Sequence, residues 1–271
     1  MTKISVIIPS IGRESLKSAI DSVLLQSMEI YEVIVVLSLP RLFVTHADKK
    51  VKFIQASTFR SISNARNTGL AQISSVTDFV AFCDDDDLWL KDKIAIQLDA
   101  IQSNGWDVCL TSATLVNQRG DSIVRPSNVY TGVTSPLRFI YSFFGPRVRY
   151  FPFPSLLINV KSLQGLKFDE NLNEREDLMF LQDLFESNAK IGQLQQPLIQ
   201  IDSSPSRSIR RVSIADDIKW FRRLSTISII SALNFLLCVS LRNHVYRIYL
   251  GLRAACPLQK FRRNLHNSIH I

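Results

Sequence analysis

The stretch Phe79-Val80-Ala81-Phe82-Cys83-Asp84-Asp85-Asp86-Asp87-Leu88-Trp89 joins five mostly apolar residues directly to four consecutive carboxylates. A short apolar run of this kind is typical of a strand that is buried on both faces of a sheet. The acidic side chains then stand at the end of a predicted strand, where they repel one another beside an apolar interior. A divalent cation removes this repulsion, and carboxylate oxygens suit Mg²⁺ or Mn²⁺. A solvated acidic loop is the alternative interpretation.

The segments before this stretch alternate between strand and helix patterns. Runs of β-branched and apolar residues predict strands at 3–9, 32–37, 51–54 and 79–83. Apolar residues at helical spacing predict helices at 16–24, 61–73 and 90–101. Strands that alternate with helices imply right-handed crossovers and a mainly parallel sheet. Ligands of such sheets bind beyond the carboxyl ends of the strands, which is where the aspartates lie.

The pattern changes after residue 105. Strands are predicted at 106–116, 122–124 and 155–160, and a helix from about 174 to 187. Segment 126–154 is rich in aromatic residues and proline, which fits either a wall of an acceptor pocket or core packing under a long loop. The first turn of the last helix holds Glu174, Glu176 and Asp177. The helix dipole favours acidic residues there, although one or two would be enough.

Composition places the chain among globular proteins with an ample core, because 46% of its 271 residues are hydrophobic. Its four cysteines show no CxxC pairing, and its four histidines form no cluster with zinc spacing. A strand pattern starts directly after Met1-Thr2 without a signal peptide. We therefore expect the reducing cytoplasm as the compartment.

The net charge of +8 comes from the C-terminal segment. Residues 207–271 hold 12 Lys and Arg against two Asp, whereas the preceding residues hold 20 basic and 22 acidic ones. An 18-residue apolar run at 224–241 is interrupted by polar groups, which argues against a membrane span. The pattern favours a basic helical tail lying on an anionic membrane surface. Packing against the rest of the chain or a second subunit is the alternative, and no nucleic-acid module is visible.

Four segments in order resemble the family 2 glycosyltransferases of the GT-A fold, over roughly residues 3–202. They are Val6-Ile7-Ile8-Pro9-Ser10, Ser63-Asn64-Ala65-Arg66-Asn67-Thr68-Gly69-Leu70-Ala71, Phe82-Cys83-Asp84-Asp85-Asp86-Asp87-Leu88-Trp89, and Phe168-Asp169-Glu170 followed by Glu176-Asp177. The resemblance implies an α/β fold with a Rossmann-like, mainly parallel sheet flanked by helices. It divides the catalytic domain, 1–206, into a nucleotide-sugar half at about 1–105 and an acceptor half at about 106–206, with the basic tail at 207–271.

The resemblance also implies a metal-dependent transfer of sugar with inversion. Asp86, helped by Asp84, would hold Mg²⁺ or Mn²⁺ on the diphosphate of a nucleotide-sugar. Asp177 would take the proton from the acceptor hydroxyl, with Glu176 beside it as the second catalytic candidate. Arg66 and Arg13 would pair with phosphate or hold the base. The residues expected to bind the nucleotide-sugar are Pro9, Ser10, Arg13, Arg66, Asp84 and Asp85.

Two features of the sequence narrow these expectations. Many members of the family carry an Asp pair after the second strand, but this chain has Leu37-Ser38-Leu39-Pro40, so a uridine donor is not implied. No Gln-x-x-Arg-Trp follows, which favours one sugar per encounter. We expect a glycan or lipid-linked acceptor at the inner face of the cell membrane, in O-antigen, capsule or exopolysaccharide assembly. The alternatives are a non-catalytic GT-A-like binding module and a nucleotidyltransferase, although residues 10–14 supply few groups for a phosphate loop.

Overall fold

The computed structural model describes residues 1–39, 45–58, 61–125, 152–172 and 176–203, together with residues 218, 219 and 222. Apart from those three residues, the predicted tail at 207–271 lies outside the described residues. The same holds for Glu174 and for most of the aromatic segment 126–154. Among the described helices, none combines the length and the apolar character that a bilayer crossing requires.

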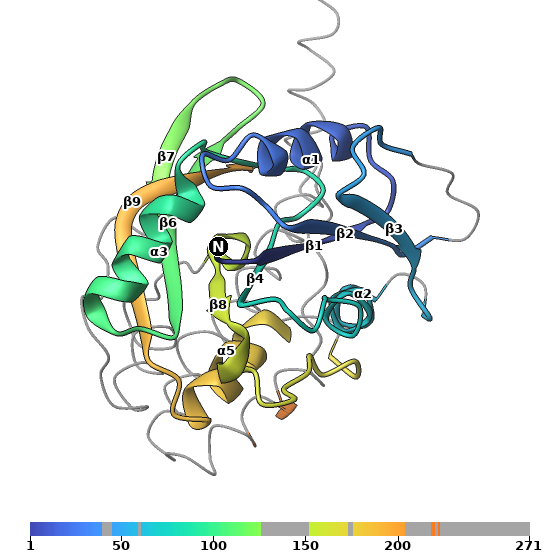
Figure 1. Ribbon diagram of the computed structural model, residues 1–271. Coiled ribbons are helices and arrows are strands. Elements are labelled where there is room, and N and C mark those ends of the chain that lie inside the picture. The colour runs from blue at the N-terminus through green and yellow to red at the C-terminus, as the bar shows by residue number, and fades with distance from the viewer. Residues whose placement is uncertain are drawn as a thin grey trace, which may run out of the picture.

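A nine-stranded sheet forms the centre of the described part, with the order β3-β2-β1-β4-β8-β6-β9-β5 and with β7 on β6 (Figure 1). The neighbours β3, β2, β1 and β4 are parallel, as the crossovers predict. Beyond β4 the pairing is mixed, because only β6 and β9 are parallel there. The strands are β1 (Ile4–Ser10), β2 (Glu32–Leu37), β3 (Val51–Gln55), β4 (Phe79–Phe82), β5 (Asp87–Trp89), β6 (Val108–Val116), β7 (Ser122–Arg125), β8 (Leu157–Asn159) and β9 (Ile191–Asp202).

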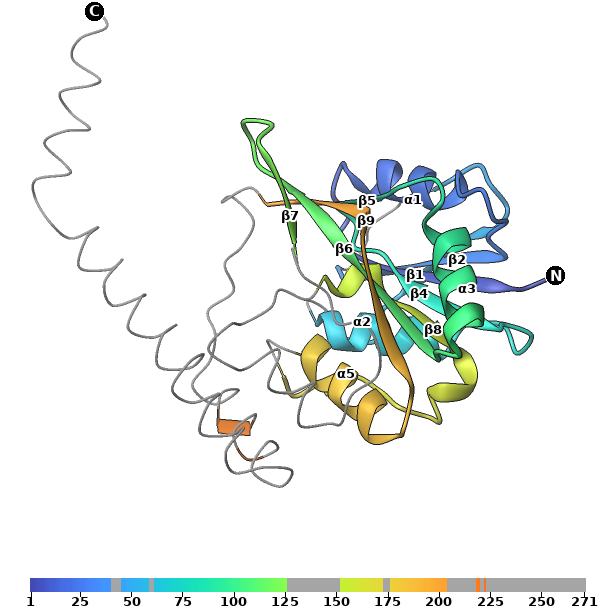
Figure 2. The same cartoon turned by 90° about the vertical axis from the view of Figure 1, so that its left-hand side faces the viewer.

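Strands β5 and β9 are not evident from the sequence. The segment Ile191–Asp202 contains four glutamines and Pro197, so it lacks the alternation that marks a strand. It pairs with β6 through register shifts between Thr111 and Ala113, and Pro197 lies within this irregular stretch. The end of β9 then pairs with β5, so that Asp87 faces Ile201. The strand β9 thus closes the sheet beside the aspartates. Figure 2 shows β6 and β7 projecting beyond it as a hairpin.

Helices cover both faces of the sheet (Figure 1). Helices α1 (Leu16–Leu24) and α3 (Lys93–Asn104) pack with β1 in one apolar cluster. Helices α2 (Ile62–Leu70) and α5 (Glu176–Glu186) lie on the opposite face in a second cluster. Two short 3₁₀ turns, η1 (Phe153–Ser155) and η2 (Val160–Ser162), flank β8. Because β1 sends alternate side chains into the two clusters, its carboxyl end is fixed from both sides.

Two glycines stand where a side chain would not fit the fold, one because of a close contact and the other because of its backbone conformation. A Cβ atom at Gly69 of α2 would lie 2.4 Å from Cγ2 of Ile7, so only glycine lets this helix sit directly on β1. Gly105 ends α3 in the left-handed conformation, with φ of 63°. The contact of Gly69 with Ile7 is important for the site, since α2 carries Arg66, which pairs with Glu176 of α5.

Candidate active site

The four aspartates form a turn between β4 and β5 at the carboxyl edge of the parallel strands. The N–H of Asp87 donates to the carbonyl of Asp84 at 3.1 Å, which closes the turn. Asp87 is buried at the start of β5. The run therefore divides into one residue that begins a strand and three whose carboxylates face different partners.

Asp85 fastens this turn to the end of β1. Its side chain is 1% exposed, and its carboxylate accepts hydrogen bonds from the Ser10 hydroxyl at 2.7 Å and the Ile11 N–H at 3.1 Å. The Arg13 guanidinium forms an ion pair with the same carboxylate. The Ser15 hydroxyl donates to the Asp85 carbonyl at 2.8 Å. Of the residues expected to contact the donor, Ser10, Arg13 and Asp85 are thus brought together.

Pro9 precedes this cluster within β1, where it pairs in register with Val36 of β2. Ser38 follows β2 and donates its N–H to the Ser10 carbonyl at 2.8 Å, so the carboxyl ends of the two strands stay joined. The neighbouring residues 40–44 are outside the described part.

Asp84 and Asp86 are the two carboxylates that fit a cation. The Asp84 side chain is 31% exposed and lies 3.4 Å from Nη2 of Arg66, and the Asp86 side chain is 10% exposed and lies 3.4 Å from Nη1 of Arg13. Among the described residues no group of three acidic, His or Cys side chains converges as a complete metal cage. Mg²⁺ is commonly held by one or two carboxylates and substrate phosphates, so an incomplete protein cage suits it.

Arg66 joins this turn to the first turn of α5. Its guanidinium lies 3.1 Å from Oε1 of Glu176 and 3.4 Å from Oδ1 of Asp84. The group is buried, and it stacks 4.1 Å from the Phe153 ring centroid and 5.4 Å from that of Phe168. A buried guanidinium that contacts two rings and two carboxylates has little freedom to turn. Arg66 therefore spans the predicted metal site and the predicted base segment.

Asp177 lies next to this bridge in the first turn of α5. Burial raises the pKa of its carboxyl, although the charge of Arg66 opposes that shift, and the negative charge of Asp84 adds to it. Its Oδ1 accepts the Leu178 N–H at 2.7 Å. Glu176, by contrast, is committed to Arg66. A carboxyl group with a raised pKa suits a general base better than one neutralised by a guanidinium.

Sequence reasoning assigned no role to Asn64, Asn67 or Glu170, which form a further link between the halves. Both amides donate to the Glu170 carboxylate, Asn64 at 2.9 Å and Asn67 at 2.8 Å. The sequence signal for these residues was their position in the segments 63–71 and 168–170, which resemble family motifs. Contact between residues about 100 positions apart follows only from the packing of α2.

Lys93 is another residue whose environment the sequence conceals. It is fully buried at the start of α3, where its amine donates to Oε1 of Gln97 at 2.8 Å and lies 3.9 Å from the Trp89 ring centroid. Burial lowers the pKa of this amine to about 7. Gln97 in turn donates to the carbonyls of Cys109 and Ser155, both at 2.8 Å.

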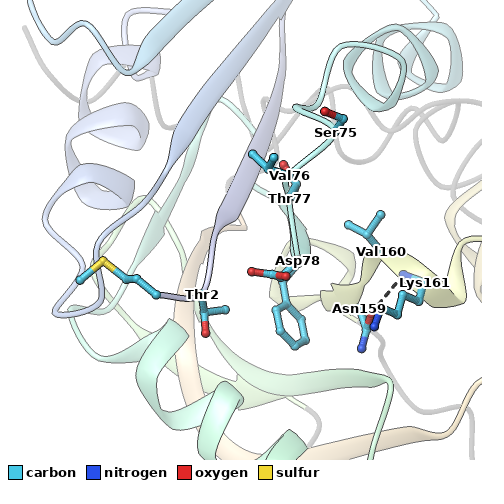
Figure 3. Close-up of a pocket in the computed structure, with 10 residues that line it drawn as sticks. Thr2, Ser75, Val76, Thr77, Asp78, Asn159, Val160 and Lys161 are labelled. Carbon is cyan, nitrogen blue, oxygen red and sulfur yellow. Dashed lines mark hydrogen bonds between the residues drawn. The ribbon is translucent and has the colours of Figure 1, made fainter.

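A pocket of about 680 Å³ lies at the opposite edge of the sheet (Figure 3). It surrounds the amino-terminal ends of β1 and β4, with Thr2, Asp78 and Lys161 among its lining residues. Parallel sheets bind ligands at the carboxyl edge, where Asp84, Asp86 and Arg66 meet. The carboxyl edge, not this pocket, is therefore the candidate active site.

Comparison with known proteins shows the family of the chain. A family model described as glycosyl transferase family 2 matches residues 5–170. An uncharacterized glycosyltransferase of Rickettsia conorii is 28% identical over 209 residues, which cover 74% of this chain and 33% of that protein. One of Rickettsia felis is 27% identical over the same length and with the same coverage. The chain thus spans about a third of the length of these two curated relatives.

Solved structures show the same fold. TarS of Staphylococcus aureus matches with a TM-score of 0.60 and 20% identity, over 83% of this chain and 39% of TarS. Residues 1–349 of TarS, crystallised with UDP, match with a TM-score of 0.60 and 21% identity, over 87% of this chain and 66% of that one. The complex of the same fragment with UDP-GlcNAc matches with a TM-score of 0.60 and 20% identity. The predicted GT-A-type sheet flanked by helices is confirmed.

Proposed function

Because the chain belongs to glycosyl transferase family 2, we propose that it moves one sugar from a nucleotide-sugar to an acceptor hydroxyl with inversion at the anomeric carbon. Its nucleotide-sugar half is about 1–105 and its acceptor half about 106–206, with 207–271 as a basic tail. The family membership supports the transfer of a sugar. The stereochemistry, the cation and the residue roles are the added content of the proposal.

The bridge formed by Arg66 is the observation that supports the proposal most. It connects Asp84, in the acidic turn after β4, with Glu176, at the start of α5. A transferase needs its donor site and its base on one reacting centre, with the groups preorganised. A module that only binds has no such requirement, and the short turn at residues 10–14 offers no extended phosphate loop for nucleotidyl transfer.

On the donor side, Asp86 and Asp84 would hold Mg²⁺ or Mn²⁺. When bound, that cation neutralises the charge that develops on the leaving diphosphate. The Arg13–Asp85–Ser10 cluster holds the acidic turn against the end of β1, which fixes where the two ligands stand. Arg13 is also within 3.4 Å of Asp86, so its charge reaches the place of the diphosphate.

On the acceptor side, Asp177 would remove the proton from the attacking hydroxyl. Its raised pKa matches this task, since a base whose pKa lies nearer the working pH transfers protons more efficiently. Arg66 holds Glu176 and limits the rise in the Asp177 pKa. A single displacement with the base opposite the nucleotide inverts the anomeric configuration.

The donor and the cation are tested together by calorimetry. UDP is the first probe, because the structurally similar TarS fragment was solved with UDP and UDP-GlcNAc, and GDP and dTDP follow, since Leu37-Ser38-Leu39 leaves the base open. We expect one diphosphate to bind only with Mn²⁺ or Mg²⁺ present, and Asp86→Ala to abolish that binding. Asp92→Asn is the matched control, because Asp92 is an exposed residue at the N-cap position of α3 whose side chain makes no capping hydrogen bond. Equal metal-dependent affinity in Asp86→Ala and in the control would contradict the metal assignment.

We further propose that the basic tail holds the enzyme on the inner face of the membrane, where a lipid-linked acceptor for a surface polysaccharide would lie. Twelve basic residues in 207–271 support this, because each Lys or Arg near an anionic surface contributes roughly 1 kcal/mol. Full-length protein should sediment with anionic liposomes at low salt, and truncation after Ser206 should release it. A full-length protein that ignores such liposomes would leave packing or oligomerisation as the role of the tail.

A further inference from the structure

Asn67 of α2 holds the backbone of Phe168 in the way that a neighbouring strand would. Its Nδ2 donates to the Phe168 carbonyl at 2.9 Å, and its Oδ1 accepts the Phe168 N–H at 2.8 Å. The same Nδ2 donates to Oε1 of Glu170 at 2.8 Å. Every hydrogen-bonding group of the Asn67 amide is therefore directed at one short segment of the acceptor half.

Asn64, one helical turn earlier, completes this contact. Its Nδ2 donates to Oε2 of Glu170 at 2.9 Å, so each carboxylate oxygen of Glu170 receives one amide. Asn64 is itself held, because its Oδ1 accepts the Thr58 N–H at 2.8 Å. We refer to Asn64, Asn67 and Glu170 as the amide clamp.

The helix that carries the clamp is fixed to the donor half. Gly69 sits against Ile7 of β1 with no space for a Cβ atom. The hydroxyl of Ser61 caps the helix by accepting the Asn64 N–H at 3.1 Å. Arg66, beside Asn67 in the sequence, reaches both Asp84 and Glu176. Helix α2 is thus fixed to the donor half, and its side chains position the acceptor half.

Phe168 connects the amide clamp to α5, the helix that carries the proposed base Asp177. Its ring stacks on Phe180 of α5 with 4.0 Å between the ring centroids and 7° between the planes. Phe180 lies on α5, whose first turn holds Glu176 and Asp177. A displacement of Phe168 therefore moves the packing surface of the helix that carries Asp177.

From this geometry we propose that Asn67 is a positioning residue for sugar transfer: by holding Phe168 and Glu170, it sets the placement of Asp177 relative to the donor. This inference rests on the proposed function. None of its hydrogen bonds involves Ser10, Arg13, Asp84, Asp85 or Asp86, the residues placed on the donor side of the site. Loss of the clamp should therefore slow the chemical step and leave donor binding unchanged. A misplacement of about 1 Å can lower a rate by on the order of 10²-fold.

The test measures Mn²⁺-dependent release of nucleoside diphosphate from a panel of UDP-, GDP- and dTDP-sugars, with water as the acceptor. For Asn67→Ala we expect kcat to fall by at least about tenfold, with the donor KM and the calorimetric diphosphate affinity within about threefold of wild type. Asn104→Ala is the control, since the Asn104 amide donates to the Ala100 carbonyl within α3, away from the clamp. It should match the wild type in both constants.

A second pair of variants separates positioning from loss of fold. Asn67→Asp keeps the acceptor for the Phe168 N–H but places a charge against Glu170, so it should lose activity as Asn67→Ala does. Adding Glu170→Gln exchanges the amide and the carboxylate, which restores one hydrogen bond between the two side chains. We expect the double variant to regain a large part of kcat.

The outcomes separate the two proposals. An active wild type with an equally active Asn67→Ala would overturn the inference alone, as would a rise in donor KM that accounts for the whole effect. Failure of Glu170→Gln to rescue Asn67→Asp would also count against the clamp. A wild type that releases no diphosphate from any donor, with Mn²⁺ or Mg²⁺, would overturn the proposed function and the inference with it.

Discussion

Nη1 of Arg66 lies 3.1 Å from Oε1 of Glu176, although the two residues are 110 positions apart in the chain. The second guanidinium nitrogen of Arg66 faces Asp84 at 3.4 Å. One buried cation thus ties the acidic turn that follows β4 to the first turn of α5. Breaking a buried ion pair by removing one partner leaves an uncompensated charge, which costs about 3–5 kcal/mol. The bridge therefore explains why the two predicted halves of the site hold a fixed relation.

Arg66→Lys tests whether the bridge serves the base or the phosphate. The lysine ammonium lacks the planar fork with which the Arg66 guanidinium contacts both Asp84 and Glu176. The first turn of α5 should therefore lose its ion pair. We expect kcat for diphosphate release to fall by about tenfold or more, with donor affinity within about threefold of wild type. Arg119→Lys, on an exposed turn, is the control. A large loss of donor affinity with kcat retained would assign Arg66 to the phosphate instead.

Asp85→Asn tests the attachment of the acidic turn to β1. The single amide oxygen cannot serve both the Ser10 and Ile11 donors and the Arg13 guanidinium, and the ion pair with Arg13 is lost. Hydrogen bonds to charged groups contribute about 1.5–3 kcal/mol. We therefore expect the free energy of unfolding, measured by urea titration, to fall below that of the wild type by about this amount. Asp92→Asn should leave it unchanged. Equal stability of the two variants would show that Asp85 has no structural role.

Glu32 predicts an acid-sensitive contribution to stability. Burial alone would raise the pKa of its carboxyl, but hydrogen bonds from Lys52, the Ser74 N–H and Ser5 outweigh burial and lower it. A lowered pKa stabilises the fold above the ordinary carboxyl range, and this stabilisation disappears as the pH falls through the folded-state pKa. Glu32→Gln should therefore be less stable than the wild type at neutral pH, by about 2 kcal/mol.

Thermal and urea unfolding between pH 7 and pH 3 would measure this effect. The gap between the wild type and Glu32→Gln should narrow as the pH falls. Glu29→Gln is the control, because Glu29 pairs with Lys50 at the surface. A gap that stays constant down to pH 3 would mean that Glu32 acts through shape and not through its charge.

Lys93 predicts a dependence of the same sign, a rise of stability with pH, on the alkaline side. Burial lowers the pKa of its amine to about 7, whereas an unfolded lysine titrates near 10.4. Between those values the unfolded state binds more protons, so stability should rise with pH, by up to about 1.4 kcal/mol per pH unit. The cysteine thiols facing it, Cys83 and Cys109, have pKa values raised by burial, that of Cys109 to about 12. In the unfolded state these thiols ionise near 8.5, so they oppose the rise above about that pH, and the Lys93 effect is clearest between about pH 7 and 8.5.

Lys93→Met should abolish that rise in unfolding free energy between about pH 7 and pH 8.5. Lys91→Met, at an exposed neighbouring position, should keep it. Urea titrations at half-unit pH steps compare the slopes. If the wild type and Lys93→Met show the same slope, the amine of Lys93 remains charged in the folded protein.

Local periodicity predicted the elements that have a clear apolar face. Strands β1 to β4 and helices α1 to α3 follow from apolar spacing, since each buries a face that the sequence alone defines. Strand β9 escaped this reasoning, because its glutamines and Pro197 break the alternation and its stability comes from pairing with β6 and β5. The mixed pairing beyond β4 follows from the same long-range contacts.

The candidate site was predictable as a set of residue types and not as a set of contacts. The acidic run and the Glu176–Asp177 pair stand out in the sequence. The order of the motifs predicted that both take part in one reaction. The burial of Arg66 against Phe153 and Phe168, and the amides of Asn64 and Asn67 on Glu170, depend on where α2 docks. Lys93 lies among charged residues in the sequence, so only the tertiary fold shows that it is buried.

The most direct test of the central claim compares the wild type with Asp177→Asn in metal-dependent release of nucleoside diphosphate from the preferred nucleotide-sugar. The amide keeps the size of the side chain and loses its basicity. A general base contributes on the order of 10²–10⁴-fold, so turnover should fall by at least about a hundredfold while calorimetry shows unchanged donor affinity. If Asp177→Asn keeps more than about a tenth of the wild-type turnover, Asp177 is not the base and the account of the acceptor side is wrong.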